Sequence, residues 1–338
     1  IGNLNGVDEM RALVRYGNNA KEFRVEEVSE PKVGPGLVKI KVAYAGICGT
    51  DIHMNTGDFD MPFPMIPGHE LSGTVVEVGE GVGDFAPGDR VIAEHTFEVC
   101  GKCSECRAGK YHLCNERYSI GFERGGAFAE YVLANSFFMH KLPDNISLAE
   151  GAMTEPLACA VHAVEFLRPL PGDNTLVVGP GPIGLLTALT LKAFNCQVAI
   201  VGTPEDGLRL SKAGEIGIKV LESNAIVTNS FDAVLECSGS QGGVKTSLNA
   251  VRKGGKFIQV GISGKPIQVD TDLVVFKELS LHGTFCHHWP TWVRTLELEK
   301  MGLIDVKPLI SEELPLEKWP EAFEKLVARD AIKILFSL

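Results

Sequence analysis

Short runs of alternating apolar and polar residues dominate the first 150 positions of the 338-residue chain. Val38–Val42 reads Val-Lys-Ile-Lys-Val, and Leu71–Val78 is a second strand-like run. This periodicity predicts half-buried antiparallel strands, and the prolines and glycines between the runs predict turns. Many short strands joined in this way favour a β-barrel or sandwich-like body over a helical one.

The pattern changes after about residue 154. A short apolar run, Thr175–Val178, is followed by glycines and then by a helical stretch over 185–194. Further strands are predicted at Gln197–Val201, Phe231–Leu235 and Lys256–Val260. Strands that alternate with helices predict a parallel, doubly wound sheet.

The last part of the chain combines both patterns. It is predicted to contain a strand over 279–285, an amphipathic helix over 317–328 and a closing strand over 331–336. The segment 217–232 is short for a strand–helix–strand passage. Either its helix is truncated or a loop is missing there.

Composition and charge narrow the class of protein. A chain of 338 residues is too long for one ordinary core, so two domains are expected. The net charge of −11 repels phosphate backbones and anionic lipids, and no Lys/Arg run offsets it, so we expect no nucleic-acid or membrane partner. The N-terminus has no signal-peptide pattern, and the apolar segment 175–194 is interrupted by glycines and prolines. Nine cysteines are too few for a disulfide scaffold and indicate metal binding in a reducing cytoplasm.

A thiolate, an imidazole and a carboxylate lie close together in the first half, at Cys48, His69 and Glu70. These donors suit zinc, and three protein ligands leave a fourth position open for chemistry. Taken alone, the three residues could equally be ordinary core residues. Cys48 and His69 are both expected to lie on loops at strand ends.

Four further cysteines, Cys100, Cys103, Cys106 and Cys114, follow the spacing C-x2-C-x2-C-x7-C. Four thiolates this close can form a closed tetrahedral site with no position for a substrate, which indicates a structural zinc. Two disulfides, a redox pair or an iron–sulfur cluster are the alternatives.

The strand at Thr175–Val178 leads directly into Gly179-Pro-Gly181-Pro-Ile-Gly184 and a helix. A strand, G-x-G-x-x-G and a helix in this order predict a dinucleotide-binding turn, with the pyrophosphate at the helix N-terminus. The acid that usually binds the ribose of NAD is missing from the end of the second strand, which reads Val201-Gly202-Thr203. Thr203 and Arg209 could instead donate to a 2′-phosphate, so the sequence favours NADP over NAD.

Three other features carry weaker signals. Glu155 precedes a proline where the two halves join; it is either a helix N-terminal residue or a further oxygen ligand of the metal. His287 and His288 are adjacent, which is not a helical metal-ligand spacing. Pocket-lining aromatic residues are proposed at Phe59, Phe122, Trp289 and Trp292, although plain packing also explains them.

Together these motifs resemble the zinc-dependent medium-chain alcohol and polyol dehydrogenases over essentially the whole chain. The matching stretches are Cys48–His53, Gly68–Glu70, Pro87–Val91, the four-cysteine lobe, Glu155–Leu157 and Gly179–Gly184. The resemblance implies a GroES-like β-barrel catalytic domain with an inserted Rossmann domain. We place the catalytic domain at 1–153 and 286–338, its zinc lobe at 94–116, and the Rossmann domain at 154–285.

The resemblance also implies a reaction and the residues that perform it. A secondary alcohol or polyol and its ketone would be interconverted by hydride transfer to or from NAD(P). Cys48, His69 and a carboxylate, from Glu70, Glu155 or the two in exchange, would hold a catalytic zinc. Thr50 and His53 match the proton relay of the family, and Asp51 would orient a ligand imidazole. Glu155 places the chain nearest the sorbitol and polyol branch, with threonine and butanediol dehydrogenases as close relatives.

Two zinc ions per chain and one NAD(P) are therefore expected. The cofactor-binding residues are predicted to be Gly179, Gly181, Pro182, Ile183, Gly184, Thr203, Arg209, Val260 and Gly261. The resemblance further suggests a homo-oligomer, a tetramer or a dimer. The rival classes are a non-enzymatic cofactor-binding protein with a structural zinc, and a zinc-finger-like nucleic-acid module. The complete set of metal donors, Cys48, His69, Glu70 and Glu155, argues against a non-enzymatic protein. The net negative charge argues against a nucleic-acid module.

Overall fold

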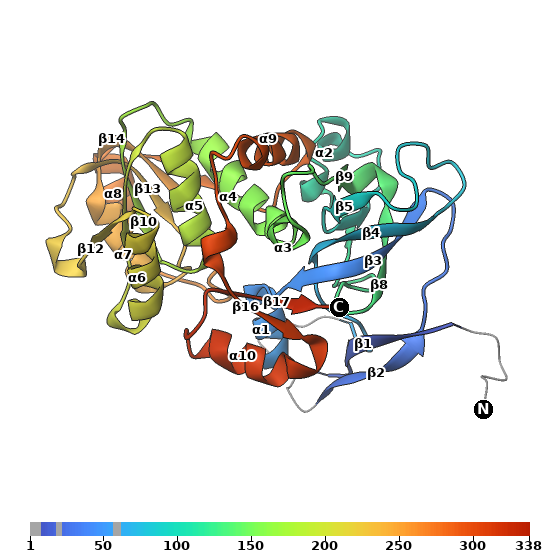
Figure 1. Ribbon diagram of the computed structural model, residues 1–338. Helices are drawn as coiled ribbons and strands as arrows, with labels where there is room; N and C mark the ends of the chain where they lie inside the picture. The colour runs from blue at the N-terminus through green and yellow to red at the C-terminus, as the bar shows by residue number, and fades with distance from the viewer. Residues whose placement is uncertain (1–7, 18–21, 57–61) are drawn as a thin grey trace. The chain divides into compact units, whose positions relative to one another are not determined.

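The computed structural model describes residues 8–17, 22–56 and 62–338. Its internal contacts divide the chain into two units (Figure 1). Unit 1 comprises Ile1–Glu155, Glu312–Val327 and Lys333–Leu338, and unit 2 comprises Pro156–Ser311 and Ala328–Ile332. The first segment of unit 1 ends at Glu155, two residues after the expected boundary at 153. The chain returns to unit 1 at Glu312 instead of 286, because helix α9 (Trp289–Lys300) is part of unit 2. In this helix, Thr291 donates a hydrogen bond to Glu165 of the same unit.

The strands of unit 1 are β1 (Glu9–Arg15), β2 (Phe23–Ser29), β3 (Leu37–Gly46), β4 (Glu70–Val78), β5 (Arg90–Ala93), β6 (Thr96–Glu98), β7 (Tyr118–Ser119), β8 (Tyr131–Asn135), β9 (Met139–Lys141), β17 (Lys333–Ser337) and, across the boundary, β16 (Ile310–Pro315). Its α-helices are α1 (Gly49–Thr56), α2 (Ser104–Arg107), α3 (Leu148–Gly151) and α10 (Trp319–Val327). The single-turn 3₁₀ helices are η2 (Tyr111–Leu113), η3 (Ser136–Phe138) and η7 (Leu316–Lys318).

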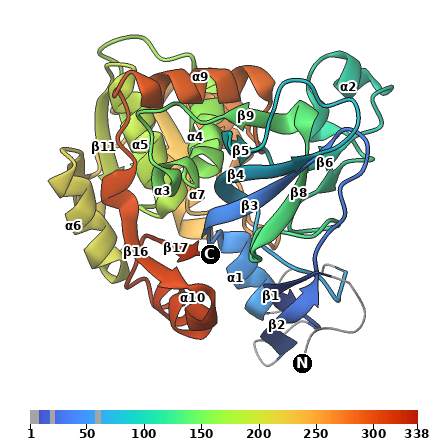
Figure 2. The same cartoon turned by 45° about the vertical axis from the view of Figure 1, so that its right-hand side comes forward.

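Seven of these strands form one sheet in the order β16-β17-β3-β4-β5-β9, with β8 also paired to β3. The pairs of β3 with β4, β8 and β17 are antiparallel. Strand β3 confirms the predicted alternation, since Val38, Ile40 and Val42 are buried whereas the intervening lysines are not. Figure 2 shows α10 beside β17, so the C-terminal segments complete this unit.

Unit 2 contains the strands β10 (Asn174–Val178), β11 (Gln197–Val201), β12 (Lys219–Leu221), β13 (Phe231–Glu236), β14 (Val251–Gln259) and β15 (Ser280–Gly283). Its helices are α5 (Pro182–Ala193), α6 (Gly207–Glu215), α7 (Gln241–Ala250), α8 (Thr271–Phe276) and α9, with η4 (Pro204–Asp206), η5 (Ser223–Ala225) and η6 (Lys307–Leu309). Helix α4 (Thr154–Leu167) begins in unit 1 and continues in unit 2.

The sheet of unit 2 is parallel, in the order β12-β11-β10-β13-β14-β15. Counted from β10 this is 3-2-1-4-5-6, the doubly wound order of a dinucleotide-binding domain. Leu176, Ala199 and Val234 form part of a buried core under the sheet. The predicted parallel, doubly wound sheet is thus confirmed. Since the strands are parallel, the carboxyl ends of β10, β11, β13 and β14 share one edge.

The passage that was expected to be short contains β12 and the single turn η5 before β13. The helix between these two strands is therefore reduced to one 3₁₀ turn. The apolar segment 175–194 forms β10, the glycine turn and α5. In the described ranges 8–17, 22–56 and 62–338, no helix has both the length and the hydropathy needed to cross a membrane.

Candidate functional site

Pairing of β3 with β4 brings the first donor cluster together. Gly46, the last residue of β3, lies opposite Glu70, the first residue of β4. Cys48 follows β3 by two residues and His69 immediately precedes β4, so both lie at the same end of the strand pair. A side chain at Gly46 could not be accommodated, because its Cβ would lie 2.1 Å from Glu70 Oε2.

The donor atoms of Cys48, His69 and Glu70 all lie within 4.8 Å of one another, with His69 and Glu70 buried. His69 Nδ1 is buried and has no hydrogen-bond partner among the described residues. Burial disfavours a charged imidazole, but Cys48, Asp51 and Glu155 together raise the pKa of His69 to about 10. An orphaned imidazole nitrogen in such a negative potential fits a divalent cation.

Glu70 is held by a buried lysine from the last strand. Lys333 Nζ lies 2.7 Å from both carboxylate oxygens of Glu70 and donates a third hydrogen bond to the Ile47 carbonyl, at 2.9 Å. The two side chains retain 2% and 1% of their exposure. Burial and the nearby Glu155 raise the pKa of Glu70, whereas Lys333 opposes that shift and fixes the orientation of the carboxylate beside Cys48 and His69.

Glu155, the other candidate carboxylate, lies outside this trio of donors. Its Oε1 is 3.1 Å from Nδ1 of His95, and both side chains are buried. Its charge still acts on both His69 and Glu70, so it lies close to the cluster. The ring of His95 is 5.8 Å from that of His69.

Helix α1 begins directly after Cys48 and carries three further predicted residues. Asp51 is fully buried, and its Oδ2 accepts a hydrogen bond of 2.9 Å from the Cys48 amide, so it orients the start of the helix. Thr50 Oγ1 is buried and has no hydrogen-bond partner within the described ranges. His53 is exposed and lies three residues along, which places it on the same helical face as Thr50.

The four-cysteine lobe has the geometry of a tetrahedral thiolate site. Cys100 Sγ lies 3.9 Å from Cys106 Sγ and 3.6 Å from Cys114 Sγ. Zinc–sulfur bonds near 2.3 Å in a tetrahedron separate the sulfurs by about 3.8 Å. Amide groups of Lys102 and Cys103 lower the pKa of the Cys100 thiol to about 6, which favours the thiolate. All four cysteines are free thiols, so the expected structural zinc fits.

The three glycines of the turn in unit 2 have different surroundings. Gly179 adopts φ +102°, a conformation that other residues rarely take. A Cβ at Gly184 would lie 1.8 Å from the Gly179 carbonyl, so only glycine allows α5 to pack this closely on the turn. A Cβ at Gly181 would point into open space, beside the α5 N-terminus that begins with Pro182 and Ile183. This free backbone fits a pyrophosphate.

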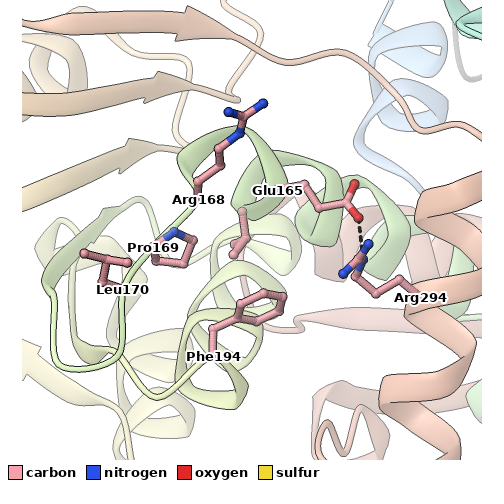
Figure 3. A pocket seen from close by; sticks show the side chains of 7 residues that line it. Glu165, Arg168, Pro169, Leu170, Phe194 and Arg294 are labelled. Carbon is pink, nitrogen blue, oxygen red and sulfur yellow. Dashed lines mark ion pairs between the residues drawn. The ribbon is translucent and has the colours of Figure 1, made fainter.

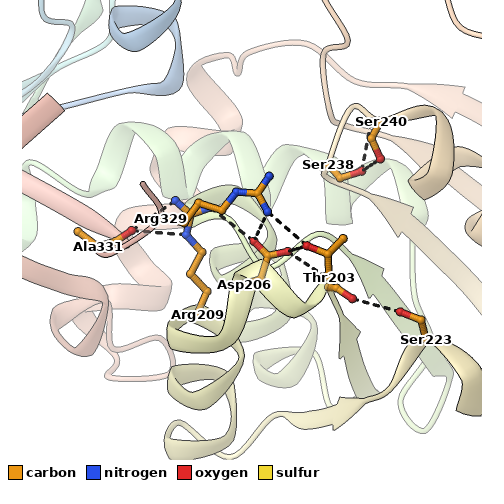
Figure 4. A network of polar contacts seen from close by, with 9 residues as sticks. Thr203, Asp206, Arg209, Ser223, Ser238, Ser240, Arg329 and Ala331 are labelled. Carbon is orange, nitrogen blue, oxygen red and sulfur yellow. Dashed lines mark hydrogen bonds and ion pairs between the residues drawn. The ribbon is translucent and has the colours of Figure 1, made fainter. Parts of the chain in front are cut away.

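A network of charges surrounds the end of β11 (Figure 4). Asp206 Oδ2 accepts hydrogen bonds from the amide and hydroxyl of Thr203, at 2.9 and 3.0 Å. Its Oδ1 accepts from Arg329 at 3.0 Å, and Arg329 also reaches the Thr203 hydroxyl, at 3.3 Å. Arg209 is mostly buried and donates to the Ala331 carbonyl, whereas 44% of the Arg329 side chain is exposed.

Val260 and Gly261 follow β14 at the same edge of the sheet as Gly179. Both amides donate to the carbonyl of Glu236, at 2.9 and 2.8 Å. The buried carboxylate of Glu236 in turn accepts from the Gly239 amide, at 2.9 Å, and from Gln259 Nε2, at 2.7 Å. Glu236 therefore shapes the loops that face the predicted cofactor.

The four predicted pocket aromatics have different surroundings. The Phe122 ring lies 5.0 Å from that of His69, beside the donor cluster. Trp292 is fully buried and its Nε1 donates to His287 Nδ1 at 2.6 Å, which is packing within unit 2. Trp289 is 40% exposed. Phe59 lies outside the described residues.

Four residues of these sites were not predicted from the sequence: His95, Glu236, Arg329 and Lys333. Lys333 left the clearest signal, since a lysine interrupts the apolar run of the closing strand. His95 and Glu236 belong to no motif. Arg329 follows α10, more than 120 residues after the strand end that it serves.

Comparisons with known proteins agree with this fold. The model of the alcohol dehydrogenase GroES-like domain matches residues 34–144, and that of the zinc-binding dehydrogenase matches 182–300. A sorbitol dehydrogenase of Halalkalibacterium halodurans is 39% identical, covering 97% of this chain and 99% of its own. D-arabitol-phosphate dehydrogenase of Enterococcus avium is 38% identical, covering 96% and 97%. The crystal structure of a zinc-binding dehydrogenase of Sinorhizobium meliloti bound to NADP superposes with a TM-score of 0.90 at 30% identity, covering 98% and 100%.

The cysteine lobe generates a direct prediction. Cys106→Ser removes one of four ligands, so metal analysis should show a fall from about two zinc ions per chain to about one, with a lower melting temperature. Cys196→Ser, which changes a thiol outside the lobe, serves as the control and should keep both. Two zinc ions in Cys106→Ser, or a visible iron–sulfur absorption in the wild type, would contradict the assignment.

Proposed function

The chain belongs to the zinc-dependent medium-chain family of alcohol and polyol dehydrogenases, and on that premise we propose that it interconverts a secondary alcohol or polyol and its ketone, with NADP as the preferred carrier. As a member of that family it is an oxidoreductase acting on a small alcohol. The main support for the proposal is the convergence of Cys48, His69 and Glu70, whose donor atoms lie within 4.8 Å of one another. L-Threonine and butanediol remain the alternative substrates within the same family.

We propose Glu70 as the third ligand of the catalytic zinc. It converges with Cys48 and His69, whereas Glu155 does not belong to that set. Glu155, oriented by His95, would hold a water or the substrate hydroxyl beside the metal. When bound, zinc would lower the pKa of an oxygen ligand as a Lewis acid, and the nicotinamide ring would carry the hydride.

Thr50 and His53 are the proposed route for the proton of the substrate hydroxyl. The buried Thr50 hydroxyl has unused hydrogen-bonding capacity within the described ranges, and a hydroxyl both accepts and donates. The exposed His53 on the same face of α1 would pass the proton on to water.

Recognition of NADP would involve Thr203, Arg329 and Arg209. Asp206, which follows the end of β11, is already engaged by Arg329 and Thr203 and is not free to bind a ribose hydroxyl. Arg329 is the most accessible cation there, with Arg209 packed behind it against Asp206 at 3.9 Å. The exposed Glu205 opposes this preference, so the proposal rests on Arg329 reaching the 2′-phosphate.

The exposed surface and the net charge suggest how the chain assembles and in which compartment it works. Strand β15 is at the edge of its sheet and every residue in it is exposed, as are Val275, Phe276 and Phe285 nearby. An exposed strand edge beside apolar side chains favours pairing with a second copy, so we propose a homo-oligomer, a dimer or tetramer, which light scattering would report. A net charge of −11 favours neither nucleic acid nor membranes, and thiolate sites require a reducing compartment such as the cytoplasm.

A panel of secondary alcohols, polyols, polyol phosphates, butanediol and L-threonine, assayed with NAD and NADP, tests the function directly. We expect at least one polyol to be oxidised, with a higher kcat/KM for NADP than for NAD. Arg329→Ala should lower kcat/KM for NADP about 10-fold or more and leave that for NAD nearly unchanged. Arg252→Ala, which removes an exposed arginine elsewhere in unit 2, is the control. A strong preference for NAD in the wild type would refute the cofactor proposal, and no turnover on any alcohol would refute the enzyme.

The two carboxylates can be separated by their effects on metal content. Cys48→Ala and Glu70→Gln should each lose the catalytic zinc, whereas Glu155→Gln should keep it and lower kcat/KM about 10- to 100-fold. Because Glu70→Gln leaves the Lys333 ammonium buried without its partner, the double variant Glu70→Gln/Lys333→Met is needed to preserve folding. A folded double variant that retains both zinc ions would exclude Glu70 as a ligand.

The proton relay has its own test. Thr50→Val preserves the shape of the side chain and removes the hydroxyl, so kcat should fall about 100-fold at neutral pH while zinc content stays at two. Thr50→Ser, which keeps a hydroxyl, should retain most of the activity. Full activity in Thr50→Val would remove this residue from the mechanism.

A further inference from the structure

Unit 2 contains a second group of metal-binding side chains that belongs to none of the sites above. It consists of His162 and Glu165 on α4 and His288 immediately before α9, and we call it the α4–α9 cluster. One donor atom from each residue lies within 4.8 Å of the others. The adjacent His287 is not a member, because its Nδ1 accepts a hydrogen bond from Trp292.

Helical spacing explains how the cluster forms. His162 and Glu165 are three residues apart on α4, so they share one face of that helix. His288 caps the start of α9, and Thr291 lies three residues further along. Two facing i, i+3 pairs on neighbouring helices are an arrangement that builds metal sites in helical proteins.

The donor atoms converge on one point, which the Thr291 hydroxyl marks. Its Oγ1 lies 2.8 Å from His288 Nδ1, 3.3 Å from His162 Nδ1 and 2.6 Å from Glu165 Oε2. The hydroxyl donates to the carboxylate and accepts from the Nδ1–H group of each imidazole, so an ion bound at this point would take the place of the hydroxyl, with both imidazoles carrying their proton on Nε2. His162 Nδ1 and Glu165 Oε2 are 3.7 Å apart, close to the separation of about 3.3 Å that a tetrahedral zinc requires.

Glu165 is oriented from behind by a second contact. Arg294 Nε bonds to Glu165 Oε1 at 2.7 Å, beside a cavity of about 410 Å³ (Figure 3). The other oxygen, Oε2, is thereby left facing the two imidazoles. Ligating carboxylates are commonly held in this way by a hydrogen bond to their second oxygen. The guanidinium charge lowers the affinity for a cation but fixes the geometry.

The cluster also borders open space. A cavity of about 530 Å³ is lined by His162, Glu165 and His288, together with His282 and Lys256. An ion can enter through this cavity, and a water can occupy the fourth coordination position. Two imidazoles and one carboxylate suit zinc better than magnesium or calcium, which prefer oxygen donors.

We propose that His162, Glu165 and His288 form a third zinc site, which joins α4 to the start of α9 within unit 2. This site goes beyond the proposed reaction and is independent of it. Zinc bound there would stabilise unit 2, because an ion that binds only the folded state raises its stability by mass action.

Calorimetric titration of the full chain, preloaded with two zinc ions, tests the proposal. Added Zn²⁺ should bind the wild type with about one further equivalent and raise its melting temperature. His288→Ala should bind no further equivalent. Glu165→Gln, which keeps the shape of the side chain and can still bond to Thr291, should bind the third zinc at least about 10-fold more weakly.

His282→Ala is the matched control, since His282 lines the same cavity but contributes no ligand. It should bind the third equivalent as the wild type does. Absence of a third equivalent in the wild type would overturn the proposal, as would its persistence in both His288→Ala and Glu165→Gln. Neither readout depends on enzymatic activity, so the result is separate from that of the alcohol panel.

Discussion

The buried ion pair between Glu70 and Lys333 is the constraint on which the candidate catalytic site depends. Removing two charges from water costs several kcal/mol for each, and only complete pairing offsets that cost. Here the ammonium group meets both carboxylate oxygens and the Ile47 carbonyl. Because Lys333 begins the last strand, the donor cluster next to β3 and β4 is complete only when the C-terminal segment has joined the sheet.

Three other carboxylates at the candidate sites are also paired with a basic side chain. Glu155 is held by His95, Asp206 by Arg329, and Glu165 by Arg294. In each case one residue can face a metal or cofactor while its partner sets the orientation. These partners come from other segments of the chain, and they determine which carboxylate is free to bind and which is already neutralised.

Local patterns predicted most of the fold. The alternation at Val38–Val42 became β3, and Gln197–Val201 became β11 with the expected bounds. The contacts return the chain to unit 1 at Glu312 and not at the expected 286, since α9 bonds to α4 through side chains about 126 residues apart in sequence. Periodicity identifies an element and its buried face, but it carries little information about which distant element covers that face.

The sequence by itself determined the four-cysteine lobe, the glycine turn and the pairing of Cys48 with His69. In the first two, the spacing confines the functional groups to within a few residues, so the backbone alone brings them together. Only the tertiary structure decided that Glu70 and not Glu155 converges with Cys48 and His69, and that Arg329 lies beside Thr203. Those choices depend on sheet register and on contacts between residues 100 to 300 positions apart, which no local pattern records.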